Sequence, residues 1–140
     1  MQIHQRPREI ALDVGLEGGG AGKWVFRAAT HAERKAHRAE HAKCLASFPE
    51  AVAAGTEDGA RSAIEKVALE RQVALLEFEE HVSRSVANMT VRLVGLGEDW
   101  PADADAQLDF LALLDDQTVA ALYSYAQEHC YGLGRSAEGN

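Results

Sequence analysis

The stretch from Ala60 to Val94 contains neither proline nor glycine, and it constrains the fold of this chain more than any other feature. One set of its larger apolar residues recurs mostly at the period of an amphipathic helix. They are Ile64, Val67, Leu75, Phe78, Val82, Val86, Met89 and Leu93, followed by Leu96. A continuous helix over 60–94 would be about 50 Å long. We therefore expect this acidic helix either to project towards a partner or to break near 88–90, where β-branched residues begin to accumulate.

Two segments near the N-terminus alternate apolar and polar residues, which is the pattern of half-buried strands. In residues 8–16 the apolar positions are Ile10, Leu12, Val14 and Leu16, and in residues 23–28 they are Trp24, Phe26 and Ala28. A glycine-rich loop over 17–22 separates the two segments, so residues 1–29 are predicted to form a β-hairpin with a flexible tip. A hairpin alone is marginally stable, so we expect it to pack on helices or to pair with the edge of another chain.

Thr30 and Glu33 match the capping box, which predicts a basic helix over 30–48. We expect its inward face to be small, formed by Ala32, Ala36, Ala39, Ala42, Leu45 and Ala46. Residues 103–131 predict a C-terminal pair of helices, and residues 132–140 resemble a loose tail. The pairs Asp103/Asp105 and Asp115/Asp116 are interpreted as helix caps.

The predicted fold class is therefore α+β and mainly α. It comprises an N-terminal β-hairpin followed by three to five helices, including one long helix over about 60–94, within a single domain 1–140. The 140 residues suffice to bury one core without disulfides, and the two cysteines do not form a disulfide framework.

Charge and hydropathy narrow the classes of partner. Residues 1–48 carry 8 Lys/Arg against 5 Asp/Glu, whereas residues 49–140 carry 6 against 17. Such an acidic chain argues against nucleic acid as the main partner. The sequence lacks an apolar run long enough for a membrane span, and its N-terminus lacks the apolar segment of a secretory signal. We expect a cytoplasmic protein.

His37, His41 and Cys44 share one face of the basic helix and are weak candidates for a zinc site. A solvated or intersubunit face is the better interpretation, because one helix supplies all three groups and no C-x-x-C pair accompanies them. The glycine loop has the wrong spacing for a phosphate-binding loop, and the chain lacks a G-x-S-x-G nucleophile motif. We therefore expect no metal, no cofactor and no catalysis.

Three passages carry a resemblance to a known family. They are residues 22–30 with Glu33 following, residues 108–119 with their Leu-Asp and Asp-x-x-Val steps, and the polar ending at 132–140. Together with the order of hairpin, capped helix and acidic helical remainder, they resemble the tail assembly chaperones of long-tailed bacteriophages.

The resemblance implies a non-catalytic viral protein of the bacterial host cytoplasm, absent from the mature virion. Such a protein binds the tape-measure protein, keeps it soluble and recruits tail-tube subunits. Self-association into a homo-oligomer is also expected. The apolar and aromatic candidates for partner contact are Phe78, Val82, Val86, Leu122, Tyr123 and Tyr125.

Three alternatives stay open. A virion structural protein, such as a connector or neck component, would be found in purified particles. A small acidic inhibitor of a host factor would retain a stoichiometric host partner. A metal-dependent enzyme would contain metal when purified.

Overall fold

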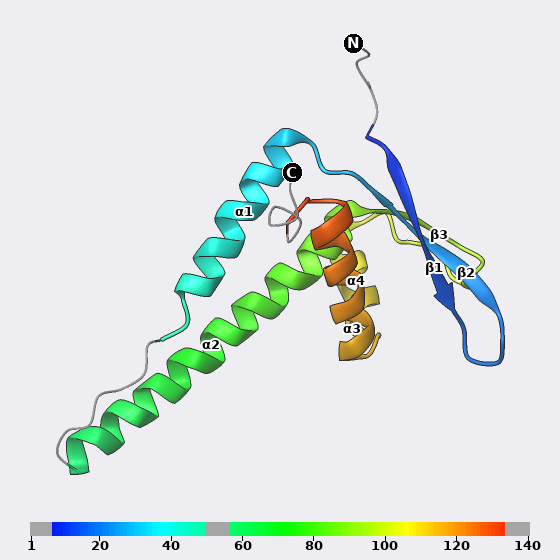
Figure 1. Ribbon diagram of the computed structural model, residues 1–140. Coiled ribbons are helices and arrows are strands. Elements are labelled where there is room, and N and C mark those ends of the chain that lie inside the picture. Colours follow the sequence, from blue (N-terminus) through cyan, green and yellow to red (C-terminus); the bar gives the residue numbers. More distant parts are fainter. Residues whose placement is uncertain (1–6, 50–56, 134–140) are drawn as a thin grey trace. The chain divides into compact units, whose positions relative to one another are not determined.

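The computed structural model describes residues 7–49 and 57–133 (Figure 1). The elements in chain order are β1 (Glu9–Gly15), β2 (Ala21–Arg27), α1 (His31–Ala46), α2 (Glu57–Met89), β3 (Thr90–Val94), α3 (Ala104–Ala112) and α4 (Asp116–His129). The predicted α+β, mainly α class is confirmed, with an N-terminal hairpin and one long helix among the helices. Across the described ranges, no helix has both the length and the apolar content needed to cross a membrane.

The chain divides into two compact units. Unit 1 comprises residues 1–37 and 82–140, and unit 2 comprises residues 38–81. Helices α1 and α2 each contribute residues to both units. The predicted tail falls mostly on 134–140, which lies outside the described residues.

The three strands of unit 1 form an antiparallel sheet in the order β1-β2-β3. At the tip of the predicted hairpin, Gly18 and Gly19 adopt φ of 91° and 96°, a backbone region that glycine occupies at no steric cost. The Leu16 N–H donates to the Gly20 carbonyl at 2.7 Å and closes the turn. The hairpin thus acquires a third strand as well as helical packing.

The long helix ends at Met89, and Thr90–Val94 form strand β3 instead of continuing the predicted helix to 94. The break falls where the β-branched residues begin, because their stiff side chains favour extended backbone. Thr90 fixes the transition through its hydroxyl, which accepts a hydrogen bond from Trp24 Nε1 at 2.9 Å and donates to the Val86 carbonyl at 2.8 Å. The buried Thr90 hydroxyl therefore has a hydrogen-bond partner both as a donor and as an acceptor.

On the face of the sheet opposite the core, an ion pair spans the central strand. Arg92 of β3 donates to both carboxylate oxygens of Glu9 of β1, at 2.9 and 2.8 Å. Because β2 lies between these strands, the pair spans it at the level of Val25, which pairs with Arg92 in the register of β2 and β3.

The core of unit 1 lies between the other face of the sheet, the end of α2, and helices α3 and α4. Its largest fully buried side chains are Phe26, Met89, Leu111, Val86 and Cys130. Helices α3 and α4 are the predicted C-terminal pair. The carboxylates of Asp103 and Asp115 cap them by accepting from Ala106 N and Thr118 N.

The buried face of α1 differs from the predicted one. The residues expected to face inward are all exposed, namely Ala32, Ala36, Ala39, Ala42, Leu45 and Ala46. His37 and Cys44 are buried instead. Burying a methyl group removes little apolar area from water, whereas a histidine ring can stack and form hydrogen bonds as well. The prediction was wrong because it ranked alanine above histidine as a buried residue.

Candidate functional site

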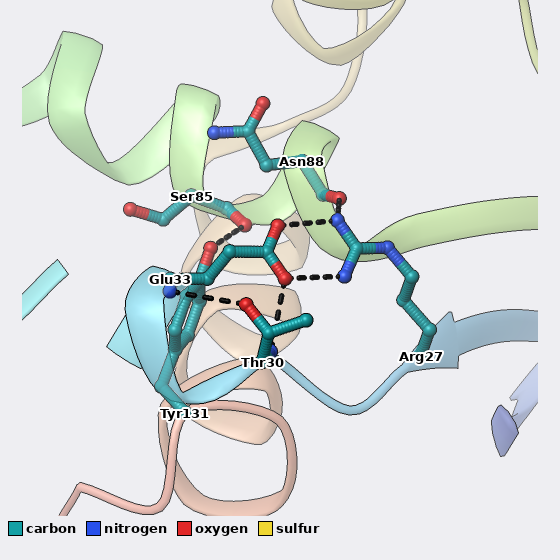
Figure 2. Close-up of polar contacts among 6 residues, drawn as sticks. All are labelled: Arg27, Thr30, Glu33, Ser85, Asn88 and Tyr131. Atoms are coloured by element: carbon teal, nitrogen blue, oxygen red, sulfur yellow. Dashed lines mark hydrogen bonds and ion pairs between the residues drawn. The ribbon is translucent and has the colours of Figure 1, made fainter. Parts of the chain in front are cut away.

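A polar junction joins the end of β2 to the first turn of α1 and the last turn of α2 (Figure 2). Arg27 donates to both carboxylate oxygens of Glu33, at 2.7 and 2.6 Å, and also to the Asn88 carbonyl at 3.0 Å. Glu33 accepts from Thr30 N at 2.9 Å, and Thr30 Oγ1 accepts from Glu33 N at 3.2 Å. The predicted capping box is therefore confirmed, and its glutamate has a second role in the ion pair.

The junction keeps its charges at neutral pH. The hydrogen bonds from Arg27 lower the pKa of the Glu33 carboxyl to about 2, and the bonds to Thr30 act in the same direction. The carboxylate in turn raises the pKa of Arg27. A carboxylate with this pKa is a poor proton donor or acceptor near pH 7. We interpret the pair as a structural connection.

Beside the junction, the C-terminal end of α4 is held by a second set of contacts. The Tyr131 hydroxyl donates to the Ser85 carbonyl at 2.9 Å (Figure 2). His37 stacks on the Tyr131 ring with centroids 3.7 Å apart, and it hydrogen-bonds the side chains of Gln127 and Ser85. Burial raises the pKa of the Cys130 thiol to about 12, so this thiol is protonated at neutral pH and is a poor nucleophile.

The three weak metal candidates do not form a site. His37 belongs to unit 1, whereas His41 and Cys44 belong to unit 2. Cys44 Sγ lies 3.8 Å from a carboxylate oxygen of Glu40. Within the part of the chain that the structure describes, no group of three or more His, Cys, Asp or Glu side chains is placed to hold a metal ion.

In unit 2, α1 and α2 meet through an aromatic cluster. The rings of His41, Phe78 and His81 lie with centroids 5.6 to 6.0 Å apart, and Phe48 contacts Phe78 edge-on at 6.3 Å. Burial lowers the pKa of His81, and the neighbouring His41 lowers it further. The phenylalanine predicted to contact a partner therefore contributes to the packing between these two helices.

A second apolar face on the same part of α2 is open to solvent. Leu69, Val73 and Leu76 are 65%, 56% and 65% exposed. Their spacing of four and three residues places them on one side of the helix. Ala74, which is buried, follows Leu69 by five positions and so lies about 140° further around the helix. We call Leu69, Val73 and Leu76 the exposed stripe.

The exposed stripe borders a hollow within unit 2. The hollow has a volume of about 440 Å³ and is lined by Ser47, Leu69, Glu70, Val73, Ala74 and Glu77. Large exposed apolar residues that border a concave surface are typical of protein-binding sites. This face is the candidate functional site.

Most of the residues predicted to contact a partner contribute to the core of unit 1. Val86 and Leu122 are buried, and Tyr123 and Tyr125 pack against the core. The Tyr125 ring stacks on Phe26 with centroids 5.6 Å apart. Their apolar character is accounted for by the fold alone.

The exposed stripe was not among the predicted partner contacts, because these came from only one periodic set of apolar residues along α2. Val82 is half-buried and belongs to that predicted set. Leu69, Val73 and Leu76 form a separate set at i, i+4 and i+7. The sequence feature that could have identified the stripe is the presence of two apolar faces on one helix, because a helix that packs on one side needs only one apolar face.

Comparisons of the chain with protein-family models, with curated proteins and with solved structures find no match. The functional interpretation therefore depends on the residues and their geometry.

Proposed function

We propose that this chain is a non-catalytic binding protein that covers an apolar helical segment of another protein, as a phage tail assembly chaperone covers a tape-measure protein. The observation that carries the proposal is the exposed stripe beside the hollow of unit 2. A long helical protein that exposes apolar stripes is prone to aggregate, and covering those stripes keeps it soluble.

The charge of the chain agrees with this role. Its formal net charge is −8, and residues 49–140 supply the excess of acidic residues. A bound coat of such molecules would repel other coated complexes and so resist precipitation. The outer edges of β1 and β3 offer backbone groups through which copies of the chain, or tail-tube subunits, could pair.

Co-expression tests the proposal. The reading frames beside the gene identify the candidate partner, which should be a long protein rich in helical heptads. We expect this partner to be soluble when expressed with the chain, insoluble without it, and recovered with it in a pull-down. Neighbouring genes of regulation or metabolism, or an unchanged solubility of the partner, would contradict the proposal.

Mass spectrometry of purified particles separates the proposal from its nearest competitor. A chaperone leaves the assembly, so the chain should be absent from mature virions. A fixed stoichiometric amount in the particles would identify a structural component such as a connector or neck protein.

A further inference from the structure

We propose that the hollow of unit 2 binds an amphipathic helix whose apolar stripe is flanked by Lys or Arg side chains. This inference deepens the proposed function and rests on it, because it names the kind of segment that the chain would cover. It depends on two features of one surface, the exposed stripe and the acidic residues that line the hollow beside it.

The apolar half of the surface is shaped to receive a side chain. Leu69 and Val73 line the hollow, and so does Ser47, which directly follows α1. Ala74 has a small side chain, which leaves room for a leucine or methionine of the occupant. Leu76, which does not line the hollow, extends the exposed apolar surface by one further turn along α2.

The charged half of the surface determines which helix fits. Glu70 and Glu77 line the same hollow. They are seven residues apart, and about 10 Å of helix rise separates them. Two cationic side chains of a bound helix, also spaced by seven residues, would match them. The Lys66–Glu70 ion pair is long at 3.9 Å and exposed, so it offsets little of this negative charge.

The same charges argue against a second copy of the chain as the occupant. Another copy would bring its own Glu70 and Glu77 to the contact, and like charges in close approach disfavour association. A basic amphipathic helix instead gains from both halves of the surface. Because the surface is small compared with a standard protein interface, we expect a dissociation constant of roughly 1–100 µM.

Binding is measured by fluorescence anisotropy with the full chain and three labelled helical peptides of about 20 residues. The first has leucines at the a and d positions flanked by lysines, the second replaces the lysines with glutamates, and the third keeps the lysines but replaces the leucines with serines. We expect the first to bind at least about tenfold more tightly than either of the others. Equal binding of the first and second peptides would overturn the charge argument, and equal binding of the first and third would overturn the apolar one.

Variants of the chain locate the contact. The triple substitution Leu69→Gln, Val73→Gln and Leu76→Gln should weaken binding of the lysine-flanked peptide by about tenfold or more. The matched control, Ile64→Gln with Leu75→Gln, removes apolar residues that are 58% and 47% exposed on another side of α2. It should change binding by less than about threefold. Equal losses in the two variants would overturn the proposed location.

Two double variants, each of which removes two negative charges, test whether the acidic residues of the hollow contribute to binding. Glu70→Gln with Glu77→Gln should weaken binding by about threefold to tenfold and flatten its dependence on salt. The control Glu79→Gln with Glu98→Gln removes two charges outside the hollow and should leave the salt dependence in place. Circular dichroism confirms that each variant is folded, and the comparison of peptides on the unmodified chain does not depend on any variant.

Three further outcomes test the occupant of the hollow and keep the inference separate from the proposed function. If the chain dimerises, and only the stripe variant abolishes the dimer, the occupant is a second copy and the inference is overturned. If the lysine-flanked peptide binds as expected but the tape-measure protein stays insoluble, the inference holds and the proposed function fails. If the tape-measure protein becomes soluble but the chain shows no preference among the peptides, the proposed function holds and the inference fails.

Discussion

Neutralising Glu33 should destabilise unit 1 by an amount that the junction geometry allows us to estimate. In Glu33→Gln the capping box keeps a suitable residue, but the charged pair with Arg27 is lost. A pKa of about 2 instead of the ordinary 4.5 corresponds to about 3 kcal/mol of differential stabilisation. The two side chains are 34% and 27% exposed, so solvent screening reduces the expected loss to about 1.5 kcal/mol.

The loss should depend on pH with a defined sign. The pKa of Glu33 is lowered in the folded state, so its stabilisation is complete above pH 4.5 and disappears as the pH falls through about 2. At about pH 3 roughly half of the contribution is gone. The difference in unfolding free energy between the unmodified chain and Glu33→Gln should therefore shrink between pH 7 and pH 3.

Urea denaturation followed by tryptophan fluorescence measures this difference, since Trp24 is buried in the core of unit 1 and Trp100 packs against it. Glu9→Gln is the matched control, because Glu9 makes a similar two-bond ion pair with Arg92 on the exposed face of the sheet. We expect a smaller loss there. Equal losses for the two variants, or a Glu33→Gln effect that is the same at both pH values, would refute the reasoning.

Three further predictions concern the packing. In Gly22→Ala the new Cβ would lie 2.6 Å from the Val94 carbonyl oxygen, so β2 and β3 must separate, and urea denaturation should show a loss of about 1–3 kcal/mol. The pKa of His81 is lowered by burial and by His41, so the unfolded state binds more protons than the folded state as the pH falls through 6.5, and stability should fall. In His81→Leu the melting temperature should therefore depend less on pH between 7.5 and 5.5 than it does in the unmodified chain. The Cys130 thiol, with a pKa of about 12, should react with a disulfide reagent at pH 8 only when urea unfolds the chain. Peptide mapping distinguishes it from Cys44, and rapid labelling of Cys130 in the native protein would contradict its burial.

The elements of this fold were predictable where short-range rules apply. The Thr30–Glu33 box and the Asp115 cap are contacts between residues three positions apart, so the sequence contains all the information that they need. The end of the long helix matches one of the two predicted alternatives, the break near 88–90, because the β-branched Thr90 and Val91 follow directly where the helix stops.

The buried face of α1 was not predictable in this way. His37 contacts Ser85 and Gln127, which are 48 and 90 positions away in the chain. A periodicity pattern counts histidine as polar, and the burial of His37 is favourable only because these distant residues form hydrogen bonds with it. The candidate site was missed for a related reason, since deciding which of two apolar faces of α2 is covered requires knowing where α1 packs.

The small core of unit 2 links partner binding to the stability of this unit. Among its described residues, the buried side chains are those of Cys44, Ala74 and His81, which are small or polar and remove little apolar area from water. Larger apolar side chains of the same helix, Leu69 and Leu76, are exposed. A partner that covers them therefore supplies apolar burial that unit 2 lacks, and at a concentration of 100 times its dissociation constant it would add about 2.7 kcal/mol. Occupancy of the hollow should accordingly be measurable as increased protection of α2 amides from hydrogen exchange, and protection confined to unit 1 would show that the partner binds elsewhere.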